Sequence, residues 1–166
     1  MAIQPGDTLP QATFFVTTLE GLDTRSTDDV FKGRRVVLVG VPGAFTPTCD
    51  RNHLPGFVAH AAAIKSKGID AIVVTAVNDA FVLKAWAAAS DAEGRIEFLG
   101  DGNADFARAI GLAMDGSARG FGPRSQRYSM IVEDAVVRAL SVEETPGRAD
   151  LSGAEALLSS LDQASP

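Results

Sequence analysis

The stretch VPGAFTPTCDRNHLPGF, residues 41–57, contains the only cysteine of a 166-residue chain. The apolar run from Val36 to Val41 leads into it and predicts a strand that is buried on both faces. Pro, Gly and Thr dominate the turn, and apolar side chains at helical spacing follow it. If a helix opens just before Cys49, the sulfur lies in the first turn, where unpaired N–H groups and the helix dipole favour negative charge. The stretch therefore predicts a strand, a turn and a helix with a reactive sulfur between them.

Length and composition predict one globular domain over residues 1–166. Of the residues, 46% are hydrophobic and 22% are charged, and the net charge of −6 argues against binding to nucleic acid or to an anionic membrane. The first ten residues contain no secretory signal, and the apolar runs are too short to span a bilayer. One cysteine cannot form an internal disulfide, which fits a reducing compartment, so we expect a cytoplasmic protein.

Alternating strand and helix patterns predict an α/β sandwich with a central mixed β-sheet flanked by helices. The expected strands are 36–41, 71–77, 96–99, 129–132 and 136–140, and the expected helices follow Pro47 or Thr48, follow Asn78 or Asp79, and cover 105–110 and about 152–161. Pro55 should kink the first helix. The second helix should present Phe81, Val82, Ala85, Trp86 and Ala89 on one side, and residues 115–127 should form a loop. The cysteine then lies beyond the carboxyl end of a parallel strand, where sites form in such sheets.

Ionisation alone does not explain a fast reaction at this cysteine. A free thiol is a few per cent ionised near neutrality, so full ionisation gains little more than tenfold, whereas each oriented donor contributes roughly 10² to 10³. Candidate donors are the Thr46 hydroxyl and the N–H groups of the turn 43–48, which Pro42 and Pro47 stiffen and in which Gly43 permits close approach. Arg127, directly before the strand YSMIV, is the candidate cation.

The segment PGAFTPTC resembles the peroxiredoxin signature P-x-x-x-T-x-x-C, with Pro42, Thr46 and Cys49 at its defining positions. RSQRYSMIV and the segments GDTLP, NDAFVLKAW, FLGDGNADFARAIGL and EDAVVRAL are similar, in the same order, to the type-five redoxin subfamily. The resemblance covers nearly the whole chain. It implies a thioredoxin-like fold and a thiol peroxidase that needs no metal, flavin or haem.

Carried over position by position, the resemblance makes Cys49 the peroxidatic cysteine. Thr46 and Arg127 would bind and polarise the peroxide, Pro42 would shield the sulfur from water, and Gly43 and Thr48 would complete the substrate-binding set. Some members carry a second, resolving cysteine near the C-terminus, but GRADLSGAEALL at 147–158 contains none. This implies a one-Cys form whose sulfenic acid is reduced by an external thiol, either glutathione with glutaredoxin or thioredoxin, and which overoxidises readily. The family also implies a homodimer.

Each of these residues also has a simpler structural interpretation. A lone cysteine can be an inert core residue, Thr46 can be only a turn residue, and Arg124 is expected at the rim of the pocket. His53 and His60 lie ~10.5 Å apart along a helix, too far apart to share a zinc ion, so we expect no metal site. Trp86 is expected in the core. Two rival functions remain: a peroxide-sensing protein that signals through the same cysteine, and an interaction or chaperone-like domain that does not use it.

Overall fold

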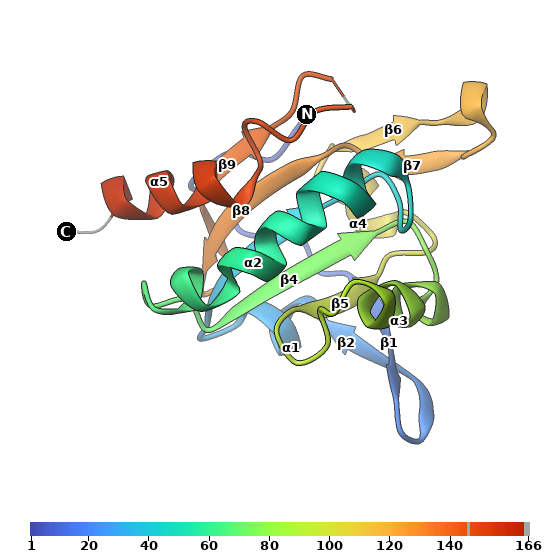
Figure 1. Ribbon diagram of the computed structural model, residues 1–166, viewed down its shortest axis with the longest axis horizontal. Helices are drawn as coiled ribbons and strands as arrows, with labels where there is room; N and C mark the ends of the chain where they lie inside the picture. Colours follow the sequence, from blue (N-terminus) through green and yellow to red (C-terminus); the bar gives the residue numbers. More distant parts are fainter. Residues whose placement is uncertain (146, 165–166) are drawn as a thin grey trace.

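The computed structural model describes residues 1–145 and 147–164, and its centre is a seven-stranded sheet in the order β2-β1-β5-β4-β3-β8-β9 (Figure 1). The strands are β1 (Thr13–Thr18), β2 (Gly21–Ser26), β3 (Arg35–Gly40), β4 (Ala71–Ala76), β5 (Glu97–Gly100), β8 (Tyr128–Glu133) and β9 (Val136–Val142). Strands β3, β4 and β5 are parallel, and the strands on either side of them pair antiparallel. The mixed sheet expected from the sequence is confirmed.

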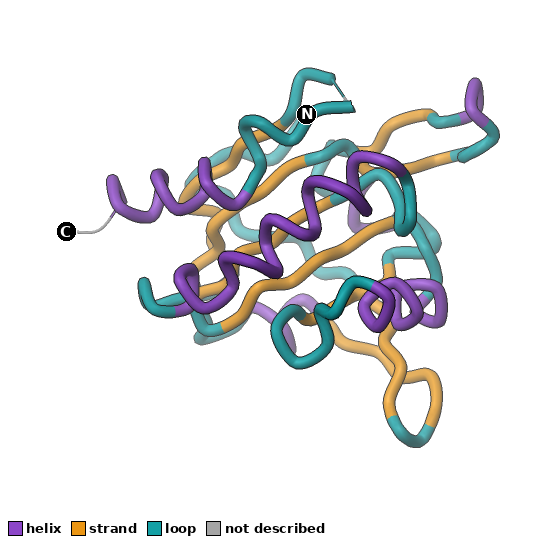
Figure 2. The backbone as a smooth tube through the Cα atoms, viewed as in Figure 1, coloured by secondary structure: helices purple, strands orange, loops and turns teal. Residues whose placement is uncertain are grey.

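Helices cover both faces of the sheet, because its central strands are apolar on both sides. Side chains alternate along β3, so Val37 and Val39 pack in one core cluster while Val36 and Leu38 pack in the other. The first cluster lies under α2 (Leu54–Lys65), α3 (Ala80–Ala89) and α5 (Ala154–Ala164), and the second under α1 (Thr27–Phe31) and α4 (Asp105–Ala109). In Figure 2, α2 crosses in front of the strands. Among the described residues, no helix has the length and apolar character needed to cross a membrane.

The turn after β3 leads into a helix that begins at Pro47, as expected. Its next turn, Cys49–His53, is a π-helix in which the Leu54 N–H donates to the Cys49 carbonyl. Pro55 has no N–H to donate, and the regular α-helix is established from Leu54 onward. The irregularity expected at Pro55 therefore takes the form of a π turn, a feature that occurs often at functional sites.

Two expectations need correction, and three elements were missed. In α3 the buried side chains are those of Ala80, Leu83, Trp86 and Ala87, whereas Phe81, Ala85 and Ala89 are exposed, so only Trp86 of the expected face is in the core. Residues 115–127 are not all loop, because β6 (Ala113–Asp115) and β7 (Pro123–Ser125) pair around a 3-10 turn. The hairpin β1–β2 and helix α1 were not predicted, although Ser26 and Asp29 form a capping box at the start of α1.

The hairpin β8–β9 carries an irregularity that matters for the site. Its register shifts by one residue between Ile131 and Val132. As a result Tyr128 pairs with Val142, and the Glu143 N–H donates to the Arg127 carbonyl at 2.9 Å. The bulge therefore sets Glu143 opposite Arg127 at the end of the sheet.

Candidate active site

The structure brings Cys49 and Arg127 together. The Arg127 Nη2 donates to the Cys49 Sγ at 3.2 Å, and both residues are buried, with exposed fractions of 3% and 0%. A guanidinium has donors only, so the sulfur acts as the acceptor, a role for which the thiolate is far better than the thiol. Cys49 also lies in the first turn of its helix, as expected. The pair thus places the sulfur beside a fixed positive charge, with one N–H donor directed at it.

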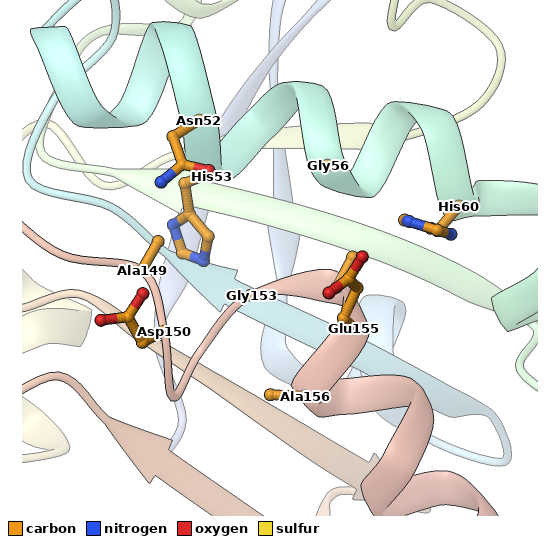
Figure 3. A pocket seen from close by; sticks show the side chains of 10 residues that line it. Asn52, His53, Gly56, His60, Ala149, Asp150, Gly153, Glu155 and Ala156 are labelled. Carbon is orange, nitrogen blue, oxygen red and sulfur yellow. The ribbon is translucent and has the colours of Figure 1, made fainter.

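His53 holds the other side of the same guanidinium. The Arg127 Nη1 contacts the His53 Nδ1 at 3.1 Å, and the His53 Nε2 contacts the Ser152 carbonyl at 2.9 Å. Because arginine can only donate and a carbonyl can only accept, the imidazole must be neutral with its proton on Nε2. The pKa of His53 is lowered to about 4, chiefly by burial and also by the nearby Arg127 charge, while the Ser152 carbonyl and Glu143 oppose these effects. Figure 3 shows the ring below α2, directed toward the segment that carries Ala149 and Gly153.

The turn 42–48 places the Thr46 hydroxyl in a defined orientation. The Thr46 Oγ1 donates to the Gly43 carbonyl at 2.7 Å, so its lone pairs remain to accept a hydrogen bond. The N–H groups of Ala44 and Thr46 are bonded to the Asn78 side chain and to the Gly43 carbonyl, and are therefore engaged within the turn rather than offered to a ligand. Thr46 is thus a turn residue and also a potential acceptor for a peroxide O–H.

The Arg124 side chain hydrogen-bonds to the same turn. Its Nη1 donates to the Pro42 carbonyl at 3.1 Å and its Nε donates to the Phe121 carbonyl at 3.0 Å. A Cβ at Gly43 would lie 2.4 Å from the Arg124 Nη1, so only glycine fits here without a shift. A side chain at residue 43 would therefore displace the Arg124 guanidinium from the turn, and the Gly43 carbonyl fixes the Thr46 hydroxyl.

A cavity of about 340 Å³ lies beside the pair, and its lining includes Pro42, Thr46, Thr48, Phe121 and Arg127. The sulfur has no exposed surface, but Arg127, which touches it, forms part of the wall. The Thr48 hydroxyl donates to the Gly147 carbonyl at 3.2 Å, and this bond links two lining residues of the cavity, one of them from the C-terminal segment. Four predicted site residues thus line one cavity, whereas Cys49 and Gly43 do not line it.

A second cavity, of about 360 Å³, lies between α2 and α5, and its lining includes Asn52, His60, Asp150 and Glu155 (Figure 3). Both histidines line it, yet no group of three or more His, Cys, Asp or Glu side chains suited to a metal occurs among the residues that the structure describes.

His53 and Glu143 are the site residues that the sequence reasoning missed. His53 follows Cys49 by four positions, a spacing that places two side chains on one face of a helix and could have identified it. Trp86 is in the core, as expected, and its indole N–H also donates to the Asp50 carboxylate at 2.9 Å, next to the cysteine.

Comparison with known proteins gives a consistent result. The redoxin family matches residues 4–158. Peroxiredoxin-2C of Oryza sativa subsp. japonica is 41% identical over 157 residues, covering 94% of this chain and 96% of its own. The structure of reduced Prx3 from Vibrio vulnificus in complex with H2O2 is 48% identical, with a TM-score of 0.91 and coverage of 96% and 99%. That of peroxiredoxin 5 from Alvinella pompejana is 34% identical, with a TM-score of 0.85 and coverage of 97% and 99%.

Proposed function

The chain belongs to the redoxin family of peroxiredoxins, and from this membership and the site we propose that it reduces hydrogen peroxide and small alkyl hydroperoxides by a one-Cys mechanism. The family makes it a thiol peroxidase. The single observation that supports the proposed mechanism is the contact of the Arg127 guanidinium with the Cys49 sulfur beside a cavity.

In the proposed reaction the Cys49 thiolate attacks one peroxide oxygen. A sulfur–oxygen bond forms, the oxygen–oxygen bond breaks, and the second oxygen leaves as hydroxide or alkoxide and takes a proton from water. Arg127 stabilises the charge that moves from sulfur to the leaving oxygen, and the Thr46 oxygen accepts the peroxide O–H and so orients it. Pro42 lines the cavity next to them and keeps water from the sulfur. The product is Cys49 sulfenic acid.

We propose that an external thiol completes the cycle, because Cys49 is the only cysteine of the chain. A first thiol attacks the sulfenic acid to form a mixed disulfide and water, and a second thiol releases Cys49 and leaves as the disulfide. Glutathione with glutaredoxin and thioredoxin are the two reductants proposed. Excess peroxide with too little reductant should convert Cys49 to the sulfinic acid.

The test is a steady-state assay with hydrogen peroxide, run in parallel with glutathione plus glutaredoxin and with thioredoxin plus its reductase. We expect many turnovers with at least one system, and none after Cys49→Ser. One equivalent of peroxide consumed with every reductant would instead support a peroxide sensor. A biological activity that survives Cys49→Ser would support an interaction or chaperone-like domain.

We also propose a homodimer formed through the face near the active site. Phe45 and Phe81 are 50% and 61% exposed, and they lie in the turn after β3 and at the start of α3, at the carboxyl ends of the parallel strands. Exposed aromatic side chains are enriched in interfaces. Sedimentation analysis of the protein and of Phe81→Glu checks this, since the variant should sediment as a monomer.

A reducing compartment, the cytoplasm, is proposed because the one thiol is free. Cell fractionation tests this proposal, since one relative from Arabidopsis thaliana is named as mitochondrial and one from Oryza sativa subsp. japonica as chloroplastic.

A further inference from the structure

We propose that Glu143 is a positioning residue for the peroxidatic pair, acting through Ser152 and His53 on the Arg127 guanidinium. The inference rests on the proposed function, and it adds to that function a residue and a loop from the C-terminal part of the chain. It starts from the β8–β9 bulge, which places Glu143 opposite Arg127.

The Glu143 carboxylate organises the loop before α5. Its Oε2 accepts from the Leu151 N–H at 2.8 Å, from the Ser152 N–H at 2.5 Å and from the Ser152 Oγ at 2.6 Å. Glu143 is 8% exposed and Ser152 is fully buried, so these bonds form away from water. Hydrogen bonds to an ionised acceptor are roughly twice as strong as neutral ones. One carboxylate therefore fixes the position of the Ser152 residue.

The fixed loop in turn determines the state of His53. The Ser152 carbonyl accepts the His53 Nε2–H at 2.9 Å, which leaves the Nδ1 lone pair for Arg127. If the carbonyl moves away, the proton loses its partner and the other tautomer becomes competitive. That tautomer would point an N–H at an arginine N–H, and two donors cannot bond. The guanidinium would then lose its hydrogen bond to His53 beside the sulfur.

The connection runs through four residues and ends at the reacting atom. In order, Glu143 holds Ser152, Ser152 holds His53, His53 holds Arg127 at Nη1, and Arg127 contacts the Cys49 sulfur at Nη2. Small errors in the orientation of a catalytic group cost large factors in rate. A carboxylate that touches neither substrate nor sulfur can therefore set the rate of peroxide attack.

The test combines Glu143→Ala with the milder Glu143→Gln, which keeps an acceptor oxygen but not the charge. The matched control is Glu144→Gln, the same change of charge at the next position, where the side chain is exposed. The readouts are kcat/KM for hydrogen peroxide and the imidazole ¹⁵N spectrum of the folded protein. The chain has two histidines, so His60→Gln assigns the His53 signals.

In the wild-type protein and the control, the spectrum should show His53 with its proton on Nε2. Glu143→Ala should give a mixture of the two His53 tautomers and lower kcat/KM by about tenfold. Glu143→Gln should lie between the wild-type protein and Glu143→Ala in both measurements. If Glu143→Ala does not fold, Glu143→Gln alone decides. A lower melting temperature with an unchanged tautomer and an unchanged kcat/KM would reduce Glu143 to a structural residue and overturn the proposal.

The spectrum does not depend on turnover, so the two proposals fail separately. A wild-type protein without peroxidase turnover but with a tautomer that responds to Glu143 would contradict the proposed function and leave the positioning of His53 intact. Normal turnover together with a His53 tautomer that is unchanged in the Glu143 variants would support the proposed function and contradict the positioning role of Glu143.

Discussion

Arg127 and Cys49 lie 78 positions apart in the chain, yet one guanidinium nitrogen lies 3.2 Å from the sulfur. The strand pair β3–β8 produces this contact, because Gly40 at the end of β3 pairs with Tyr128 at the start of β8. The residue before β8 and the helix after β3 therefore meet at the same end of the sheet. The Arg127 side chain also binds His53, so its orientation is set from two sides.

Arg127→Gln should slow peroxide attack on Cys49 by roughly 10² to 10³, because it removes an oriented cationic donor. The loss should exceed the fall in the thiolate fraction, which ultraviolet absorbance of the thiolate measures. Stopped-flow fluorescence of Trp86, the only tryptophan and bonded to Asp50 next to the cysteine, follows the reaction. The exposed Arg138→Gln is the control and should react normally. A rate loss that only tracks ionisation would contradict a transition-state role for Arg127.

Thr46→Val should lower kcat/KM for hydrogen peroxide by ~10², since the isosteric side chain cannot accept the peroxide O–H. The variant also loses the bond to the Gly43 carbonyl, which should cost about 1 kcal/mol of stability. Thr24→Val, at an exposed position in β2, is the control and should change neither kcat/KM nor the stability. Wild-type kinetics in a folded Thr46→Val protein would leave Thr46 as a turn residue only.

Gly43→Ala should destabilise the protein and reduce activity, because the new Cβ would lie 2.4 Å from the Arg124 Nη1 and 3.2 Å from the Thr46 Cγ2. Arg124→Ala should relieve part of the effect, and a double-mutant cycle on unfolding free energies measures the coupling. Gly56→Ala is the matched control: its Cβ would meet only the Ala154 Cβ at 3.8 Å, and alanine in a helix should stabilise by about 0.5–1 kcal/mol. Additive effects at residues 43 and 124 would refute the clash.

Acid should destabilise the protein through His53. Its pKa is about 4 when folded and ordinarily near 6.5, so between these values the unfolded chain binds the extra proton. The stabilising contribution is complete above pH ~6.5 and is lost as the pH falls toward ~4, by on the order of 3 kcal/mol. Urea unfolding across this range should show the loss in the wild-type protein and in His60→Gln. His53→Asn should flatten the curve, and an equally steep curve in that variant would assign the effect to other groups.

Much of the site follows from local sequence. Cys49, Thr46 and Pro42 are close in the chain, so a strand, a turn and a helix place them with little help from the rest of the fold. The buried strands are also visible locally, because β3 and β4 are apolar throughout. In α3 nearly every position is apolar, so periodicity could not separate the buried Leu83 from the exposed Phe81.

Other features depend on long-range pairing. β2 is polar and mostly exposed, so its sequence carries no burial pattern, and it is a strand because it pairs with β1. The role of Glu143 depends on the register of β8 and β9. A regular hairpin from the pairing of Glu133 with Val136 would place Val142 opposite Arg127, and nothing in the local sequence announces the shift between Ile131 and Val132.

That shift has a practical meaning for anyone who edits this hairpin. A β9 of the same length that paired regularly from Glu133 and Val136 outward would have its outer half turned over, with the Val142 side chain where the Glu143 carboxylate now meets the loop. A graft of these two strands into another scaffold would need to reproduce this shift in pairing, or the transplanted arginine would lack the support of the glutamate.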